Sequence, residues 1–147
     1  IKAALDARTD PDFVIVARSD APFDEACERL NAYAEAGADL VKTVPRNHEE
    51  FIQLPKRVKA PLHLGFTSGK GIHDNMDAWD IGKAGYKIVT FPMIPFNVIA
   101  FSGFQALKTL AAEATDENIT GKFTLDEYFD FIGFDELQAL EKKYLFK

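Results

Sequence analysis

Short apolar runs alternate with longer amphipathic stretches over most of the chain. The runs cover residues 13–17, 38–44, 61–66 and 87–92, and apolar residues recur at helical spacing between them. Nearly continuous apolar character over such a short run is typical of a strand that is buried on both faces of a parallel sheet. The pattern therefore predicts four consecutive strand–helix units.

The spacing of these strands indicates the kind of sheet. The strands are marked by Val14, Leu40, Leu62 and Ile88, which are separated by 26, 22 and 26 residues. Uninterrupted units of this length are typical of parallel α/β folds, and eight of them fill the roughly 200–250 residues of a (β/α)8 barrel. Four strands cannot close a barrel and would leave open edges. Two alternatives remain, half of a barrel or an open, doubly wound sheet.

The stretches between the runs have the features of helices. One helix is predicted over residues 23–36, and a second around residues 51–58. Pro55 is expected to limit the second helix, because proline costs about 3 kcal/mol in a helix interior. A third helix is predicted over residues 75–84, with Asp74 as its N-cap.

The last third of the chain is predicted to be helical. A long helix over residues 95–114 carries apolar side chains on more than one stripe, which indicates contacts on two sides. Thr124 and Glu127 have the spacing of a capping box at the start of another helix. We therefore expect residues 1–93 to form half-barrel strand–helix units. Residues 94–147 are expected to form a helical region that packs on the barrel and on a partner subunit.

Composition narrows the possible functions. The 147 residues are 47% hydrophobic and carry a formal net charge of −6, which disfavours nonspecific binding to nucleic acid or to an anionic membrane. No unbroken apolar run is long enough to indicate a membrane span. The single cysteine, Cys27, allows no internal disulfide and fits a reducing, cytoplasmic location. Residues 1–7 have the pattern of a helix end without a cap before it, so we expect the chain to begin inside a longer fold.

The end of the first apolar run carries a candidate site residue. Arg18 directly follows residues 13–17, and ligands bind at the carboxyl ends of strands in parallel sheets. Its guanidinium presents a fork of donors that matches a carboxylate or a phosphate. The alternative is a structural ion pair between Arg18 and a local acid such as Asp20.

Several segments resemble one enzyme family. The sequence IVARSDA at residues 15–21 is very close to the VARTDA strand of the isocitrate lyase/phosphoenolpyruvate (PEP) mutase superfamily. The following helix and turn, residues 25–39, are similar to that family's EA-x-x-R-x-x-A-Y-x-x-AGAD pattern. Further similar segments lie at Pro61-Leu62, Ala84–Lys87, Phe91-Pro92 and Gly133–Glu136. The chain thus resembles this superfamily over nearly its whole length.

The resemblance implies an architecture. The family has a modified TIM (β/α)8 barrel, of which this chain would be the C-terminal half, strands five to eight. The family's helix after strand eight swaps between subunits, which fits the two-sided helix at residues 95–114. Members are usually dimers or tetramers, so the resemblance implies a homo-dimer or tetramer formed through this helix.

The resemblance also implies a chemistry. Family members bind Mg²⁺ and make or break a C–C or P–C bond beside the carbonyl of a 2-oxo acid, and a bound cation stabilises the enolate. The family's metal-holding acids and catalytic loop come from the first half of the barrel, so no metal ligand is assigned in this chain. The implied function is a Mg²⁺-dependent C–C lyase that acts on a 2-oxo or 2-hydroxy dicarboxylic acid. The alternatives are a phosphonate mutase or hydrolase of the same superfamily, and a non-catalytic barrel.

Individual positions take their expected roles from the family's motifs. Arg18 matches the arginine that grips the acid group of the substrate, and it is expected to be a catalytic and substrate-binding residue. Asp20 is expected to orient Arg18. Thr67 matches a threonine that lines the site, and the adjacent Ser68 is a further substrate-binding candidate. Pro92 matches a residue in the wall of the site.

Two positions depart from the lyases of the family. Val44 stands where lyases carry a glutamate, and Gly65 stands where many carry an asparagine. Both changes remove polar contacts to the distal carboxylate, which argues against a tricarboxylate lyase of the 2-methylisocitrate type. His63 lies inside a strand and is expected to be a packed core residue rather than a catalyst.

Overall fold

The computed structural model describes residues 1–66, 71–73 and 75–145. The chain divides into two units, Ile1–Ile94 and Pro95–Lys147. Among the described residues, the first unit contains the strands and the second contains only helices and loops.

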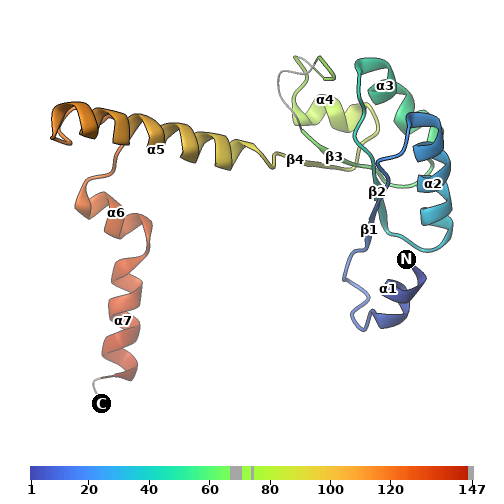
Figure 1. Cartoon of the computed structure of the whole chain (residues 1–147). Helices are drawn as coiled ribbons and strands as arrows, with labels where there is room; N and C mark the ends of the chain where they lie inside the picture. The colour runs from blue at the N-terminus through green and yellow to red at the C-terminus, as the bar shows by residue number, and fades with distance from the viewer. Residues whose placement is uncertain (67–70, 74, 146–147) are drawn as a thin grey trace. The chain divides into compact units, whose positions relative to one another are not determined.

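The first unit alternates strands and helices (Figure 1). The strands are three residues long, shorter than the apolar runs that predicted them. In chain order the elements are α1 (Lys2–Ala7), β1 (Val16–Arg18), α2 (Phe23–Glu35), β2 (Leu40–Lys42), α3 (His48–Arg57), β3 (His63–Gly65), α4 (Ala78–Lys83) and β4 (Ile88–Thr90). The predicted order of four strand–helix units is thus confirmed.

All four strands run parallel. β1 pairs with β2, and Arg18 lies opposite Lys42. β3 pairs with β4, and Gly65 lies opposite Thr90. A bridge between Val41 and Leu62 joins the two pairs, so the strands follow one another in chain order. The carboxyl ends of the strands therefore lie along one edge.

The core lies between the strands and the helices. α2 packs on β1 and β2, and α4 packs on β4. The helices contribute fully buried side chains, and the strands contribute Val41 and Leu64 to the same core. The fully buried helical residues include Leu30, Phe51, Leu54 and Ile81. Burial of these large apolar side chains is the main force that holds the helices on the strands.

The opposite face of the strands is open among the described residues. Val16 is 46% exposed and Ile88 is 43% exposed, although both lie inside strands. Phe13 and Val14, which precede β1, are also exposed. The prediction that the first strand is buried on both faces is therefore wrong for this chain, because the helices cover only one side of it.

Helix α3 continues through its proline. The expectation that Pro55 limits this helix is wrong, because α3 extends to Arg57. Pro55 has no N–H to donate to the carbonyl of Phe51, four residues earlier. The hydroxyl of Tyr86 donates to that carbonyl instead, at 2.8 Å. A contact from a distant strand–helix unit thus satisfies the group that the proline leaves without a helical partner.

Helix α4 is shorter than predicted. It begins after Asp77, whose side chain accepts a hydrogen bond from the amide of Asp80. The predicted N-cap, Asp74, lies outside the described residues. The capping mechanism was expected correctly, but a different aspartate performs it.

The second unit consists of α6 (Leu125–Phe131), α7 (Phe134–Tyr144) and most of the long helix α5 (Ile94–Glu113). The predicted capping box at Thr124 and Glu127 is confirmed. None of the described residues of these helices is buried. Within the described part of the chain, no helix combines the length and the apolar character needed to cross a membrane.

Candidate functional site

Arg18 is the last residue of β1 and lies at the carboxyl edge of the strands. Its Nε donates to Oδ1 of Asp20 at 2.9 Å, and its Nη2 lies 2.8 Å from the same oxygen. The side chain of Arg18 is 52% exposed, and the ion pair leaves Nη1 outside this contact. Asp20 thus orients the guanidinium and leaves part of its donor fork available to a ligand.

Lys42 is the last residue of β2 and the register partner of Arg18. Paired residues of parallel strands point to the same face of the sheet, so both cationic side chains share one face. Lys42 is half-buried, and this burial lowers the pKa of its ammonium. The Arg18 guanidinium lowers that pKa further, whereas Asp20 raises it. Among the described residues, the Lys42 ammonium has no hydrogen bond or ion pair.

The ends of β3 and β4 form the other side of this region. A Cβ atom placed on Gly65 would lie 3.3 Å from Nζ of Lys42 and 3.9 Å from Oγ1 of Thr90. The missing side chain of Gly65 therefore lets the Lys42 ammonium lie close to the backbone of β3, with the Thr90 hydroxyl near the same point. Nε2 of His63 lies 2.9 Å from Oγ1 of Thr90. Burial, and then the nearby Lys42 ammonium, lower the pKa of His63.

Four consecutive strands thus bring polar groups to one face. Arg18, Lys42 and Thr90 end their strands, and His63 begins β3 and contacts Thr90, so we call these four residues the strand-end cluster. Two of its side chains are cationic, and the positive charge is concentrated where the strands end. The arrangement can hold an anionic group by charge-assisted hydrogen bonds, which are stronger than those between neutral groups.

The structure describes two of the four residues expected at the site, Arg18 and Pro92. Arg18 has the predicted place at a strand end. Pro92 is exposed in the turn after β4, while Arg18 ends β1 at the other end of the strand order. Thr67 and Ser68 lie outside the described residues. Of the two expected site residues that the structure describes, Arg18 belongs to the strand-end cluster and Pro92 does not.

Three members of the strand-end cluster were not expected from the sequence. Lys42 and Thr90 lie inside apolar runs and were treated as parts of strands, and His63 was expected in the core. His63 is instead half-buried and bonded to Thr90 near the strand ends. One signal was available, because a polar residue occurs near the end of successive runs. Their convergence depends on strand register, which the sequence pattern did not specify.

The described residues do not form a metal site. Among them, no group of three or more His, Cys, Asp or Glu side chains is placed to hold an ion. The single cysteine, Cys27, packs in the core, and burial raises the pKa of its thiol. The expected Mg²⁺ therefore has no ligand set among the described residues.

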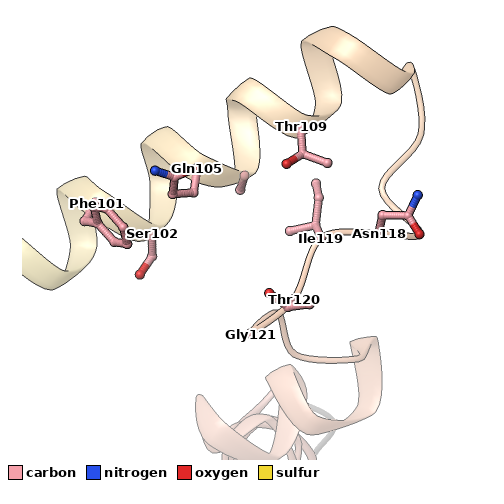
Figure 2. A pocket seen from close by; sticks show the side chains of 9 residues that line it. Phe101, Ser102, Gln105, Thr109, Asn118, Ile119, Thr120 and Gly121 are labelled. Atoms are coloured by element: carbon pink, nitrogen blue, oxygen red, sulfur yellow. The ribbon is translucent and has the colours of Figure 1, made fainter.

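A hollow in the second unit offers a different surface. Figure 2 shows Ile119 of the loop after α5 pointing toward Thr109 of the helix. The lining contains polar and apolar side chains but no charged one, so it lacks the groups that would bind an acid. The lining residues are Phe101, Ser102, Gln105, Ala106, Thr109, Asn118, Ile119, Thr120 and Gly121. The strand-end cluster is the better candidate for an anionic ligand.

Comparison with known proteins finds clear relatives. No family model matches the chain. A 2-methylisocitrate lyase of Aeropyrum pernix is 37% identical over 145 residues, which are 94% of this chain and 46% of the relative. The chain thus spans about half the length of the curated relatives it matches.

Solved structures give the same picture of the fold. A phosphoenolpyruvate phosphomutase from Streptomyces platensis subsp. rosaceus superposes with a TM-score of 0.85 at 28% identity, over 98% of this chain and 52% of that one. A phosphonopyruvate hydrolase in complex with oxalate and Mg²⁺ has a TM-score of 0.81 at 24% identity, over 98% and 53%. The α/β architecture of this chain therefore matches about half of each of these folds.

Proposed function

Because the chain belongs to the isocitrate lyase/PEP mutase superfamily, we propose that it forms the substrate-anchoring half of a barrel enzyme that is a C–C lyase. The proposed substrate is a 2-oxo or 2-hydroxy dicarboxylic acid, and the proposed reaction passes through an enolate. The four parallel strands in chain order support a half-barrel, since each has the place of a barrel strand.

The position of Arg18 carries the proposal. It stands at the carboxyl end of a parallel strand, where this type of sheet binds its ligands, and Asp20 holds its guanidinium in one orientation. A guanidinium with part of its fork available matches the two oxygens of a carboxylate. Held in this way, an acid group would be oriented with the rest of the substrate over the carboxyl edge of the strands.

The chain's own contribution is to bind and orient the substrate. A divalent cation is part of the proposed reaction, but the described residues do not fit a metal site. We assign the cation to residues outside those described and derive no step through it. A phosphonopyruvate hydrolase of the same fold was solved with Mg²⁺, and this is the reason for proposing Mg²⁺ as the cation.

Two alternatives use the same anchoring role. The likeness to a phosphomutase supports a phosphonate substrate, since the guanidinium fork also matches phosphonate oxygens. A non-catalytic barrel is the other alternative, because Val44 and Gly65 remove polar groups from the ends of two strands. Lyase activity is preferred because two relatives that are 37% and 34% identical over 94% and 90% of this chain are lyases.

We further propose that α5 packs against a second copy of the chain. It exposes large apolar side chains along its length, and exposed apolar area on this scale marks an interaction surface. These residues include Phe96, Ile99, Phe101, Phe104 and Leu107.

The test of the anchoring role is Arg18→Gln in the natural protein that carries this sequence. Loss of a charge-assisted, two-oxygen contact should cost about 2–4 kcal/mol of transition-state stabilisation, or roughly a thirty- to thousandfold fall in kcat/KM. The assay is a screen of 2-oxo and 2-hydroxy diacids with added Mg²⁺.

Arg29→Gln is the matched control. Arg29 pairs with Glu25 on the surface of α2, and a surface pair of this kind contributes little. It should leave kcat/KM within about twofold of the unchanged protein. Equal kcat/KM values for Arg18→Gln and Arg29→Gln would refute the role of Arg18.

A further inference from the structure

We propose that Lys42, Gly65 and Thr90 form a second anion subsite, which binds a second acid group of the substrate. The ligand class is a small molecule with two acid groups, the second a carboxylate or a phosphonate. This inference rests on the proposed function, because the first acid group is the one assigned to Arg18.

The shape of the subsite comes from the missing side chain of Gly65. A methyl group at that position would lie 3.3 Å from Nζ of Lys42, which is closer than most such contacts, and 3.9 Å from Oγ1 of Thr90. The ammonium and the hydroxyl thus lie near one point beside Gly65, at the carboxyl edge of the strands. Both groups can donate hydrogen bonds, so they can reach the same acid group.

The charge of the subsite favours an anion. Lys42 is half-buried beside the guanidinium of Arg18, and the two like charges raise the free energy of each other's charged form. Asp20 counteracts this, but its Oδ1 already accepts from Nε of Arg18 and lies 2.8 Å from its Nη2. A bound acid group would supply the negative charge that this pair of cations lacks.

His63 orients the hydroxyl of Thr90 through a hydrogen bond. Nε2 of His63 lies 2.9 Å from Oγ1 of Thr90, and burial lowers the pKa of the histidine, which favours its neutral form. When Nε2 carries the proton, it donates to Oγ1 and leaves the hydroxyl proton of Thr90 free to donate to the ligand. His63 is therefore a positioning residue, and Lys42 and Thr90 are the groups that would touch the acid.

The register also sets the relation between the two subsites. Lys42 is the strand partner of Arg18, and neighbouring strands lie about 5 Å apart. One short molecule can therefore reach both cations. A monoacid would occupy only the Arg18 subsite, so a preference for diacids over monoacids is the expected signature of the second subsite.

The experiment compares three ligands that share a propionate skeleton. Propionate has one acid group, succinate has a second carboxylate, and 3-phosphonopropionate has a phosphonate in its place. Their dissociation constants are measured by isothermal titration calorimetry on the natural protein that carries this sequence. The tighter of the two diacids identifies which acid group the second subsite prefers.

Two variants remove the subsite in different ways, and each has a matched control. Lys42→Met removes the charge, and Lys56→Met makes the same change on the exposed surface of α3. Gly65→Ala places a methyl group against the Lys42 ammonium without changing the charge. Gly82→Ala places a methyl group in open space on α4. Arg18→Gln reports on the first subsite alone.

The expected result is selective. Lys42→Met should raise the dissociation constant of the tighter-binding diacid roughly ten- to a hundredfold, which corresponds to the loss of a hydrogen bond to a charged group. It should change the dissociation constant of propionate less than threefold. Gly65→Ala should weaken the same diacid severalfold, and both controls should match the unchanged protein. Arg18→Gln should weaken all three ligands.

Two results would overturn the inference, and they differ. If Lys42→Met and Lys56→Met bind the diacids equally while Arg18→Gln weakens every ligand, the second subsite is refuted and the proposed function stands. If Arg18→Gln changes no dissociation constant, or no ligand binds the unchanged protein, the anchoring role fails and the inference fails with it.

Discussion

The hydrogen bond between Tyr86 and α3 gives the sharpest prediction on stability. Pro55 cannot donate to the carbonyl of Phe51, and the hydroxyl of Tyr86 does so at 2.8 Å. Burial raises the pKa of the Tyr86 phenol, so it remains a protonated donor at neutral pH. The ring of Tyr86 also stacks on that of Phe51, with centroids 4.9 Å apart.

The substitution Tyr86→Phe keeps the ring and removes only the donor. Phe51 and Tyr86 are 0% and 2% exposed, so water does not replace the lost hydrogen bond at this position. An unsatisfied buried acceptor costs about 1–3 kcal/mol of unfolding free energy. In a protein of about this length, each kcal/mol lowers Tm by roughly 2–4 °C.

A second substitution tests the cause. Pro55→Ala restores a backbone N–H that can donate to the Phe51 carbonyl, and it keeps the Cβ that packs against Gly85. In this background Tyr86→Phe should cost about 1 kcal/mol less than in the unchanged protein, which a double-mutant cycle measures directly. The assay is equilibrium urea unfolding followed by far-ultraviolet circular dichroism.

Tyr128→Phe is the control, because Tyr128 is 48% exposed and its hydroxyl makes no hydrogen bond among the described residues. It should change the unfolding free energy by less than about 0.5 kcal/mol. The reasoning is refuted if Tyr86→Phe costs the same with Pro55 and with Ala at that position.

Two further predictions concern pH and assembly. The pKa of Asp39 is lowered because its carboxylate accepts a hydrogen bond from the Ile15 amide and pairs with Arg8. The ionised carboxylate therefore stabilises the fold at pH values above the ordinary pKa of an aspartate, and this stabilisation is lost as the pH falls through the lowered pKa. The Tm gap between the unchanged protein and Asp39→Asn should therefore shrink from about pH 7 to about pH 3, and a constant gap would contradict this sign. Ile99 is 72% exposed on α5, and Ile99→Glu should reduce the molar mass measured by light scattering. If the unchanged protein is already a monomer, the proposed packing of α5 against a second copy is refuted.

The order of elements could be predicted because it depends on local pattern. Apolar runs and helical spacing identified four strand–helix units, and the Thr124 capping box identified the start of α6. The one-sided burial of β1 could not be predicted in the same way. Apolar character shows that a face is fit for burial, but exposure also depends on which other segments are present to cover it.

The continuation of α3 through Pro55 has a similar explanation. The expected cost of an interior proline is correct for an isolated helix, because one carbonyl loses its donor. The compensating donor, Tyr86, is 35 residues from Phe51 in the chain. A pattern within one segment does not contain that contact, so it could not show that the helix continues past Pro55.

The site shows the same division between local and nonlocal information. Arg18 was found because a charged residue directly follows an apolar run. Lys42 was overlooked because its run continues for two residues beyond it, through Thr43 and Val44, so it did not mark a strand end. Its relation to Arg18 comes from the pairing of β1 with β2, and its relation to Gly65 comes from the bridge between β2 and β3.

The open face makes the charge at the strand ends more significant. The chain as a whole carries a net charge of −6, yet Arg18 and Lys42 stand side by side at one edge of the strands. Covering this face, as the rest of a barrel would, removes water from both cations and increases the cost of keeping them charged. Asp20 already pairs with Arg18, so a second acid group would mainly offset the charge of Lys42, and this is the expected basis of the proposed preference for a ligand with two acid groups.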